Sequence, residues 1–390
     1  MAAPGPDAGY RPRGLAGRAE RPLPVHQDAG HLLGRPGVSL QVSQGAATVL
    51  GAYRSSLRRR RLLLALLGVI AVAAFLLDVA VGPSAMSFAE ALRALFDPDS
   101  ATPLARTVVW QARLPPAVMA VLVGMALAAA GAEMQTILNN PLASPFTLGV
   151  SSAAACGAAL AIVLGLAIPG LSPRWAVSAN AFLFAFGAVG LLQLVIRWRG
   201  AGVEALVLLG IALVFTFNAV VALIQFVASQ DALQQLVFWT LGSLGRTQWD
   251  GIAIVAVVLA VVIPFSWRAA WRMTVLRLGE ERARGLGVDV GGLRFWALAR
   301  ISLLAAAAVA MVGTIGFIGL VAPHVARLLL GEDHRFLLPG SLLCGAAIMS
   351  LAAMASEMLV RGAVLPLGIV TALVGLPVFI LLILGGKRRG

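Results

Sequence analysis

Apolar segments of about 20 residues recur along the whole chain, and they constrain its fold more than any other feature. A helix of that length crosses the hydrocarbon core of a bilayer, whereas the strands of a membrane barrel are about half as long. The composition agrees, because 59% of the 390 residues are hydrophobic and 12% are charged. We therefore predict an all-α polytopic membrane protein with about ten transmembrane helices. The expected spans are 62–82, 116–138, 145–169, 176–196, 204–229, 251–271, 294–315, 318–331, 337–360 and 366–386.

The distribution of arginine predicts the orientation of these spans. The runs RRRR (58–61) and KRR (387–389) fall on the side that also holds Arg277, Arg282 and Arg284. The opposite side holds fewer arginines, so the positive-inside rule places both termini in the cytoplasm, which an even number of spans requires. Arginines that flank spans also account for the net charge of +13, and we expect no nucleic-acid partner.

Residues 1–61 differ in composition from the rest of the chain. They are rich in Pro, Gly and Arg, lack the apolar core of a signal peptide, and end in RSSLRRRR (54–61). We expect a basic, disordered cytoplasmic arm, followed by a transmembrane domain over 62–390. Within that domain, 86–97 (MSFAEALRALFD) is expected to form a short amphipathic helix outside the bilayer, and 231–246 a re-entrant or interfacial piece.

The chain lacks the residues that a nucleotide site or a metal site requires. A phosphate-binding P-loop needs a lysine followed by Ser or Thr, but the only lysine, Lys387, is followed by Arg388. The four histidines do not cluster, no HExxH motif occurs, and both cysteines lie within apolar runs. We therefore expect no catalytic residue, no metal and no cofactor held by this chain.

Charged residues inside spans are the remaining candidates for chemistry, because burying them is costly. Glu133, near the inner end of the second span, fits either a proton relay or a structural carboxylate that pairs with an arginine. Arg300, near the start of the seventh span, is expected to extend to the cytoplasmic face. Glu357 and Arg361 stand four residues apart with the acid first, which favours a helix pair and a structural role for Glu357.

Small residues predict where helices approach closely and where one breaks. Gly124, Ala128 and Gly131 in the second span permit close contact between helix backbones. In GTIGFIGL (313–320), a glycine recurs every third residue just before Pro323. We expect the helix to break there, as broken helices at membrane depth line a cavity or a subunit contact.

Two segments on the predicted cytoplasmic side are unusual. QTILNNPLASPFTLG (135–149) separates two apolar spans with an uncharged turn that holds two prolines and two asparagines. The longest cytoplasmic connection, 273–294, contains LGEERARGLGV (278–288), which predicts a short helix that stops at Gly287. On its own pattern, such a helix either lies on the lipid headgroups or docks a cytoplasmic partner.

Six motifs carry a resemblance to a known family, in order and at matching spacing from about 109 to 386. They are RLPP (113–116), GMALAAAGAEMQ (124–135), NPLASPFTLGVSSA (140–153), LGEERARGLGV (278–288), GTIGFIGLVAPHVARLLLGEDHRFLLPGS (313–341) and LPLGIVTALVGLPVFI (365–380). Together they resemble the permease subunits of binding-protein-dependent ABC importers of the FecCD family, which take up iron-siderophores, haem and cobalamin.

The resemblance implies the type II ABC importer permease architecture in a bacterial cytoplasmic membrane. Two permeases, either identical copies or this chain with a similar paralogue, would enclose a path along their two-fold axis. Two cytoplasmic P-loop ATPase subunits would bind ATP and Mg, and an extracytoplasmic solute-binding protein would deliver the cargo. The implied cargo is a metal chelate, first an iron-siderophore and otherwise haem or cobalamin.

The resemblance also assigns roles to particular residues. The implied coupling helix, near 278–290, contacts the ATPase through Leu278, Gly279, Glu280, Arg282, Ala283, Leu286 and Gly287. The implied cytoplasmic gate consists of Asn140, Pro141 and Leu142 together with Gly202, Val203 and Glu204. The implied docking residues for the solute-binding protein are Arg113 and Arg361, and those lining the path are Thr216, Asn218 and Gln225.

Two other classes of protein remain as alternatives. An ion-coupled secondary transporter would use intramembrane carboxylates such as Glu133 and Glu357, and would favour broken helices in both halves of an inverted repeat. No such repeat is evident in the sequence. An intramembrane enzyme would need a nucleophile with its base or a metal motif, and neither is evident.

Overall fold

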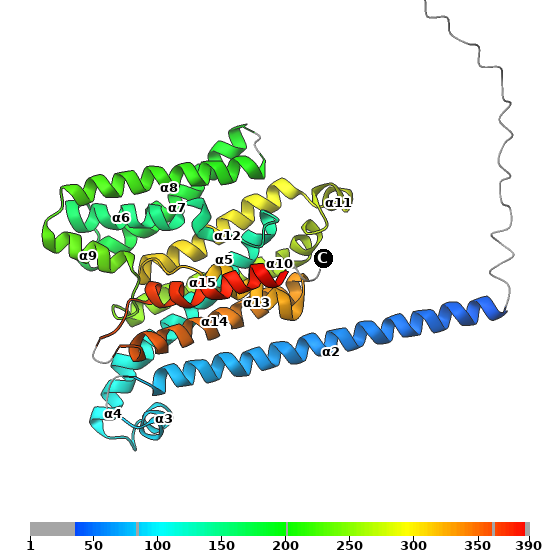
Figure 1. Cartoon of the computed structure of the whole chain (residues 1–390), viewed down its shortest axis with the longest axis horizontal. Coiled ribbons are helices and arrows are strands. Elements are labelled where there is room, and N and C mark those ends of the chain that lie inside the picture. Colours follow the sequence, from blue (N-terminus) through cyan, green and yellow to red (C-terminus); the bar gives the residue numbers. More distant parts are fainter. Residues whose placement is uncertain (1–35, 83–85, 200–201, 361–362, 387–390) are drawn as a thin grey trace, which may run out of the picture. The chain divides into compact units, whose positions relative to one another are not determined.

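The described part of the chain is built from helices alone. The computed structural model describes residues 36–82, 86–199, 202–360 and 363–386, and no strand occurs among them (Figure 1). The elements are α2 (Pro36–Ala80), α3 (Phe88–Phe96), α4 (Pro103–Thr107), the π-helix η1 (Val108–Arg113), α5 (Leu114–Ile137), the 3-10 helix η2 (Pro145–Leu148), α6 (Val150–Leu164), α7 (Pro173–Arg199), α8 (Val203–Phe226), α9 (Gln230–Thr240), α10 (Trp249–Leu276), α11 (Glu280–Gly285), α12 (Val290–Val312), α13 (Ile318–Leu330), α14 (His334–Met358) and α15 (Leu367–Gly386).

The helices correspond to the predicted spans. Among the described residues, seven helices are long and apolar enough to cross a membrane, and three shorter apolar helices accompany them. Each of the ten expected spans overlaps one of these helices, so the predicted all-α polytopic fold is confirmed. The short helix expected over 86–97 is present as α3, and most of α9 falls within 231–246, where a re-entrant or interfacial piece was expected.

The chain divides into two compact units, Met1–Arg58 and Arg59–Gly390. In the first unit the structure describes residues 36–58, which form the start of α2. This differs from the disordered arm expected over 1–61, because Pro36 suits the first turn of a helix and no proline follows it before Pro83. The expectation for residues 1–35 lies outside the described residues.

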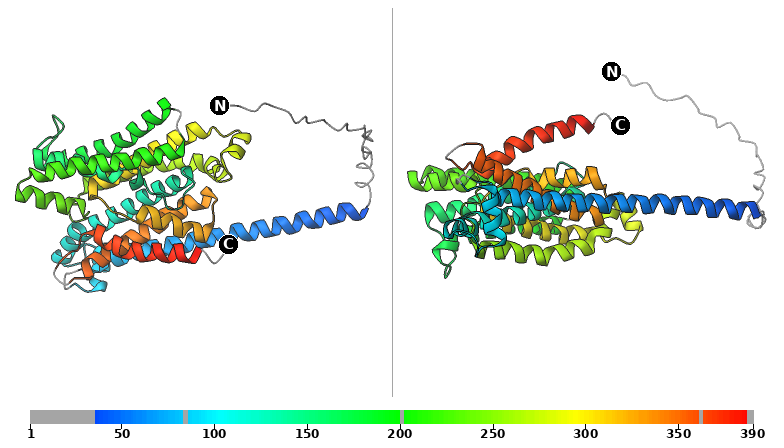
Figure 2. Two further views of the ribbon diagram at one scale, coloured as in Figure 1. Left: turned by 45° about the horizontal axis from the view of Figure 1, so that its top comes forward. Right: turned by 90° about the horizontal axis from the view of Figure 1, so that it is seen from below.

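Helix α5 lies at the centre of the second unit and packs against α10, α12, α13 and α14 (Figures 1 and 2). Its small residues allow these contacts. A Cβ added at Gly124 would overlap the carbonyl of Gly345 in α14, and a Cβ added at Gly131 would overlap the carbonyl of Gly319 in α13. The close packing predicted for these two glycines is therefore confirmed.

A second group of helices, α6 to α9, lies beside this centre and includes the green helices of Figure 1. Helix α6 contacts α7, α8 and α9, and α12 joins the group to α5 through its contacts with α7. Helix α8 is the least covered of the seven long helices, with 17% of its most apolar stretch buried. An apolar face of α8 is therefore left without a partner in the single chain.

The predicted break after the seventh span is confirmed. Helix α12 ends at Val312, and Gly313 and Phe317 both adopt positive φ values, of 79° and 67°. The irregular segment between them lies against the end of α9, where the Ser243 amide donates a hydrogen bond to the carbonyl of Val312, 2.8 Å away. The break thus connects α12, α13 and α9 at one end of the bundle.

The two ends of the bundle carry different elements. At one end, here called the α11 end, lie the turn 138–149 between α5 and α6, helix α11, and the connection 331–333 between α13 and α14. The opposite end, here called the α9 end, carries α3, α4, α9 and the break at 313–317 (Figure 1). The residues predicted for gating and coupling belong to the α11 end.

Candidate gate and coupling site

The turn 138–149 has a well-defined local structure. Asn139 adopts a φ of 46°, a left-handed conformation that asparagine tolerates better than most residues. The Oδ1 atom of Asn140 accepts a hydrogen bond from the Leu142 amide at 2.9 Å, which satisfies a backbone group in the turn. The turn then continues into η2, which begins at Pro145, and ends at Gly149 with a φ of 81°.

The tip of this turn is accessible. Asn140 and Pro141 are exposed, the Leu142 side chain is 43% exposed, and Ala143 is buried beneath them. The tip contains no charged residue, so it can contact an apolar surface without the cost of desolvating a charge. The structure therefore places Leu142 where it can meet a partner or a second copy of the chain.

The last turn of α5 is held by polar contacts from α13. Gln135 is fully buried; its Nε2 atom donates to the carbonyl of Leu320 at 3.2 Å, and its Oε1 accepts from Nη1 of Arg327 at 2.7 Å. A buried amide with both ends satisfied fixes the rotation of its helix relative to its neighbour.

Glu332 connects Arg327 to the end of α10. Its carboxylate accepts from Nε of Arg327 at 3.0 Å and from Nη2 of Arg277 at 2.9 Å. Arg277 follows α10 directly, and its Nη1 donates to Oδ1 of Asn139 at 2.7 Å. The Glu332 carboxylate therefore binds two arginines. Arg327 contacts the last helical turn of α5, and Arg277 contacts the turn 138–149.

Helix α14 contributes a further contact to the same helix end. His334, which is 2% exposed, lies with Nε2 at 2.7 Å from Oγ1 of Thr136, and its backbone amide donates to Oγ1 of Thr274 at 2.9 Å. This histidine joins α5, α10 and α14 within the bundle. Among the described residues no group of three or more His, Cys, Asp or Glu could hold a metal ion.

Glu133 pairs with Arg300 inside the bundle. Nε of Arg300 donates to both carboxylate oxygens, at 3.0 and 3.1 Å. The Glu133 side chain is 2% exposed and the Arg300 side chain is 10% exposed. Of the two possibilities for Glu133, the structure favours the carboxylate paired with an arginine. The expectation that Arg300 extends to the cytoplasmic face is wrong, because a buried carboxylate across the α5–α12 contact holds its guanidinium inside.

The segment predicted to form the coupling helix contains a shorter helix than expected. Helix α11 covers Glu280–Gly285, and Gly279 and Gly287 on either side adopt φ values of 103° and 79°. The predicted stop at Gly287 is confirmed. Ala283 is buried under the helix, whereas Leu278 and Leu286 are 55% and 56% exposed. Two exposed leucines on a tightly bent segment form a small apolar contact surface.

This segment is also bonded to α5 from the side of α12. Arg294 pairs with Glu280, and its Nε atom donates to the carbonyl of Ile137 at 3.3 Å. Glu280 pairs in addition with Arg284, at 3.3 Å. The hydrogen bond from Arg294, together with the charges of both arginines, lowers the pKa of the Glu280 carboxyl despite its partial burial. The carboxylate therefore stays ionised and keeps α11 attached to α12.

The second predicted gate segment begins α8. Gly202 precedes the first turn of α8, which starts at Val203, and Glu204 is exposed in that turn. Contact between α8 and the turn 138–149 is made further along, where a Cβ added at Gly210 would lie 2.9 Å from the carbonyl oxygen of Thr147. The two segments therefore lie on elements that touch, at the same end of the bundle.

The residues predicted to line the path lie along α8. Thr216 and Asn218 are exposed and Gln225 is half-buried. The Thr216 hydroxyl donates to the carbonyl of Ala212 at 2.8 Å, so its donor is satisfied within the helix. This leaves an exposed face of α8 that is apolar apart from a few uncharged polar groups.

Arg113, one of the two residues predicted for docking, lies near the α9 end. Arg113 is 8% exposed, and its Nη1 atom donates to the carbonyls of Val79 and Ala80, at 3.2 and 2.8 Å. It therefore satisfies the last carbonyls of α2, as a basic side chain at a helix C-terminus can do. Arg361, and with it the predicted pair with Glu357, lies outside the described residues.

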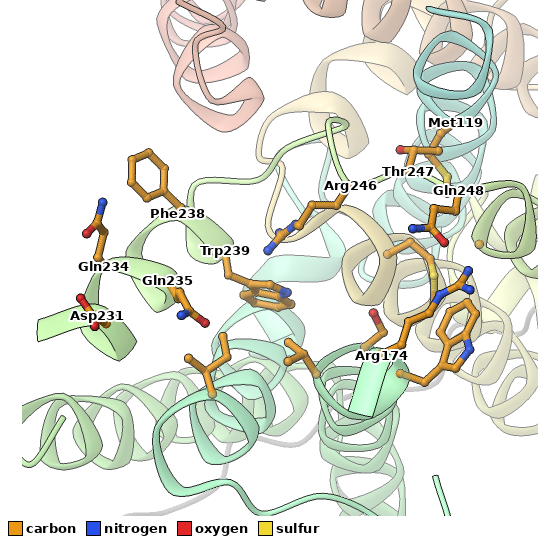
Figure 3. Close-up of a pocket in the computed structure, with 16 residues that line it drawn as sticks. Met119, Arg174, Asp231, Gln234, Gln235, Phe238, Trp239, Arg246, Thr247 and Gln248 are labelled. Atoms are coloured by element: carbon orange, nitrogen blue, oxygen red, sulfur yellow. The ribbon is translucent and has the colours of Figure 1, made fainter. Parts of the chain in front are cut away.

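A cavity of about 810 Å³ lies at the α9 end (Figure 3). In Figure 3 the Arg246 side chain extends toward the Trp239 ring, and Gln235 lies on the other side of that ring. Burial lowers the pKa of the Arg246 guanidinium. Nearby, Arg174 pairs with Asp250 at 2.6 Å and stacks over the Trp175 ring. The cavity is of a size that can hold a small molecule.

Several residues of this site were not predicted from the sequence. They are Asn139, Arg277, Arg294, Arg327 and Glu332. Arg277 and Arg294 flank the LGEERARGLGV segment in the sequence. Their position beside this segment is the one sequence signal that could have indicated their contacts with the turn 138–149 and the end of α5.

The fold and this site define a class of protein, namely a polytopic helical permease in which one helix end is tied to a short exposed segment. The chain belongs to the FecCD transport family, whose model matches residues 69–385. The family named from its motifs is therefore confirmed.

Relatives and a solved structure agree with this assignment. The chain is 36% identical over 277 residues to the hemin transport system permease protein HmuU of Yersinia pestis, covering 71% of this chain and 83% of that protein. It is 36% identical over 324 residues to the vitamin B12 import system permease protein BtuC of Shigella boydii serotype 18, covering 83% and 94%. It is similar to a solved structure described as an inward-facing metal-chelate type ABC transporter, with a TM-score of 0.73 and 30% identity over 83% of this chain and 99% of that one. The chain is thus a multi-pass permease subunit of an ABC importer.

Proposed function

We propose that this chain is the membrane subunit of an ATP-driven importer that moves a metal chelate across a bacterial cytoplasmic membrane. The observation that carries the proposal is the connection between α11 and the turn 138–149. The α11 segment presents Leu278 and Leu286 outward, and Arg277 and Arg294 on either side of it bond the end of α5. A force applied to this segment therefore reaches the turn.

The α11 end faces the cytoplasm in this proposal. Arg277, Arg284 and Arg294 lie at this end, as do Arg197 and Arg272, and the positive-inside rule places such a surface on the cytoplasmic side. Both termini then lie in the cytoplasm. The α9 end, with α3 and α4, faces outward.

The partners follow from the family and from the exposed surfaces. Two cytoplasmic P-loop ATPase subunits bind ATP and Mg and contact Leu278, Gly279, Glu280, Arg282, Ala283, Leu286 and Gly287. This chain holds no cofactor of its own. A second permease, identical or paralogous, covers the exposed face of α8, and a path along the two-fold axis is lined by Thr216, Asn218 and Gln225.

Gating is a change between two arrangements of the dimer. In the closed arrangement, Leu142 and its copy meet at the axis, and Asn140, Pro141, Gly202, Val203 and Glu204 support the closure. ATP binding by the partner displaces α11, and Arg277 and Arg294 transmit the displacement to the turn. An uncharged turn suits this role, because it closes the path without retaining ions.

The solute-binding protein docks on the outward α9 end. Arg361 is the candidate contact for its acidic side chains, because charge-assisted contacts of this kind steer docking. Arg113 is the second candidate, although its present contacts with α2 would have to open for it to reach a partner.

The proposed cargo is an iron-siderophore, with haem and cobalamin as the other members of the class. The relatives named for hemin and vitamin B12 support a large chelate. An ion-coupled mechanism through Glu133 is less favoured, because that carboxylate is buried and already paired with Arg300.

Affinity purification from the native membrane tests the proposal. The unmodified chain is expected to recover a P-loop ATPase, and Leu286→Asp is expected to lose it, because a charge replaces an apolar contact. Leu171→Asp makes the same exchange in an exposed leucine of the connection after α6, at the α9 end, and should retain the ATPase. Recovery of no ATPase with the unmodified chain, or its retention by Leu286→Asp, would contradict the proposed coupling.

A further inference from the structure

A second cavity, of about 750 Å³, lies at the α11 end beside the coupling segment. It is bordered by the last turns of α7, the start of α8, α11 and the first turns of α12. Part of its lining is apolar, formed by Ile196, Leu206 and Leu298. Three arginines also line it, namely Arg197, Arg284 and Arg294. A cavity lined by both basic and apolar side chains favours an amphipathic anion.

The positive charge of this cavity exceeds the negative charge available to balance it. Glu280 is the single acidic residue of its lining, and Arg284 and Arg294 already share that carboxylate. Arg197 has no hydrogen-bond or ion-pair partner among the residues that the structure describes. An anionic group in the cavity would supply a partner for Arg197 and would offset the mutual repulsion of the three guanidinium groups.

The position of the cavity at the ends of two candidate spans indicates which kind of anion it binds. Helices α7 and α12 both belong to candidate spans, and the cavity lies where both reach the α11 end. Trp296, 64% exposed, lines it and packs edge-to-face with Phe295 at a centroid distance of 5.5 Å. Tryptophan with arginine at the end of a span is typical of the headgroup region of a bilayer.

We propose that this cavity binds the headgroup of an anionic phospholipid, with its phosphate on Arg197, Arg284 and Arg294 and its glycerol and first methylenes on the apolar lining residues. The lipid then lies directly against Glu280 at the start of α11. A phospholipid suits the cavity better than a soluble phosphate ion, since an ion would leave Ile196, Leu206 and Leu298 uncovered. The inference requires the membrane location of the chain and does not depend on the cargo.

Native mass spectrometry of the purified full chain tests this proposal, after exchange into detergent containing phosphatidylglycerol or phosphatidylcholine. The unmodified chain should retain phosphatidylglycerol preferentially. Arg197→Gln should weaken that retention about fivefold, the effect of one basic side chain on an anionic headgroup. Arg272→Gln removes an exposed arginine of α10 that does not line the cavity, and should leave retention unchanged. Arg197→Lys, which keeps the charge, should recover part of the loss.

The remaining outcomes overturn the proposal. Equal retention of both lipids would indicate a neutral site, and equal loss with Arg197→Gln and Arg272→Gln would indicate a diffuse surface attraction. Displacement of phosphatidylglycerol by excess inorganic phosphate would identify a soluble anion as the occupant. Because Arg197 is exposed and has no partner among the described residues, the melting temperature of Arg197→Gln should match that of the unmodified chain, which separates lost binding from lost folding.

Discussion

Arg277, directly after α10, donates a hydrogen bond from Nη1 to Oδ1 of Asn139 at a distance of 2.7 Å, and the two residues are 138 positions apart in the chain. The same guanidinium bonds Glu332, and on the other side of α11 Arg294 bonds the carbonyl of Ile137. Two arginines that bracket one exposed segment thus hold the same helix end. A displacement of α11 cannot leave the turn after α5 unaffected unless both contacts break.

Arg277→Gln should uncouple ATP hydrolysis from transport. The shorter amide cannot reach Asn139 and Glu332 together, so the link between α11 and the turn is lost while the leucines of α11 remain. We expect transport per ATP hydrolysed to fall about 10- to 150-fold, the effect of losing charge-assisted hydrogen bonds worth about 1.5–3 kcal/mol. Uptake and phosphate release are measured in parallel in proteoliposomes. Arg272→Gln, in the last turns of α10, serves as the control, and a normal ratio in Arg277→Gln would show that the link is not used.

The pair of Glu133 and Arg300 predicts a non-additive effect on stability. Glu133→Leu leaves a buried guanidinium unpaired and should lower the free energy of unfolding by about 3–5 kcal/mol. Arg300→Met leaves a buried carboxylate and should cost a similar amount. The double variant has no buried charge and should recover most of the loss. The free energies of unfolding of the unmodified chain, the two single variants and the double variant, measured in detergent, give the coupling energy of the pair. A loss in the double variant equal to the sum of the two single losses would contradict a structural pair.

Gly131 should not tolerate even one methyl group. A Cβ at this position overlaps backbone atoms of Gly319. Backbone atoms cannot move aside as the flexible end of a side chain can. Gly131→Ala is therefore expected to destabilise the protein by about 1–3 kcal/mol. Gly187 in α7 has open space around it, so Gly187→Ala should be neutral or stabilising by about 0.5–1 kcal/mol. Equal melting temperatures for the two variants would exclude the close contact of α5 and α13.

Glu280 predicts how stability depends on pH at the α11 end. The hydrogen bond from Arg294 lowers the pKa of Glu280 from its ordinary value of 4.5, so the contribution of the pair is fully present above that value. It is lost as the pH falls through the lower pKa of the folded state. The unmodified chain should therefore lose more thermal stability than Glu280→Gln between pH 6 and about pH 3, because the variant lacks the titrating group. The same loss in both proteins would mean that Glu280 does not contribute.

The positions of the apolar helices, the break at 313–317 and the glycine contacts of α5 could all be predicted from the sequence. Each depends on local composition, such as the length of an apolar run or the spacing of Gly124 and Gly131. The end of α11 before Gly287 could also be predicted from local sequence, because glycine readily adopts the positive φ found there.

The polar contacts of the site depend on which helices meet, and that information is not local. Arg300 was expected to extend to the cytoplasmic face, because a lone arginine near the end of a span usually does. Glu133 nevertheless lies opposite it once α5 and α12 pack together. Arg277 and Glu332 could not be connected to Asn139 for the same reason. The helix that continues through 36–61 was missed because charge and glycine content outweighed the absence of an interior proline.

Uptake into proteoliposomes tests the central claim most directly. The vesicles contain this chain with the ATPase that co-purifies with it, the solute-binding protein is added outside, and a ferric siderophore is the labelled cargo. We predict uptake that requires ATP at the α11 side and stops with a non-hydrolysable analogue. Uptake by this chain alone, driven by an ion gradient without ATP, would contradict the account.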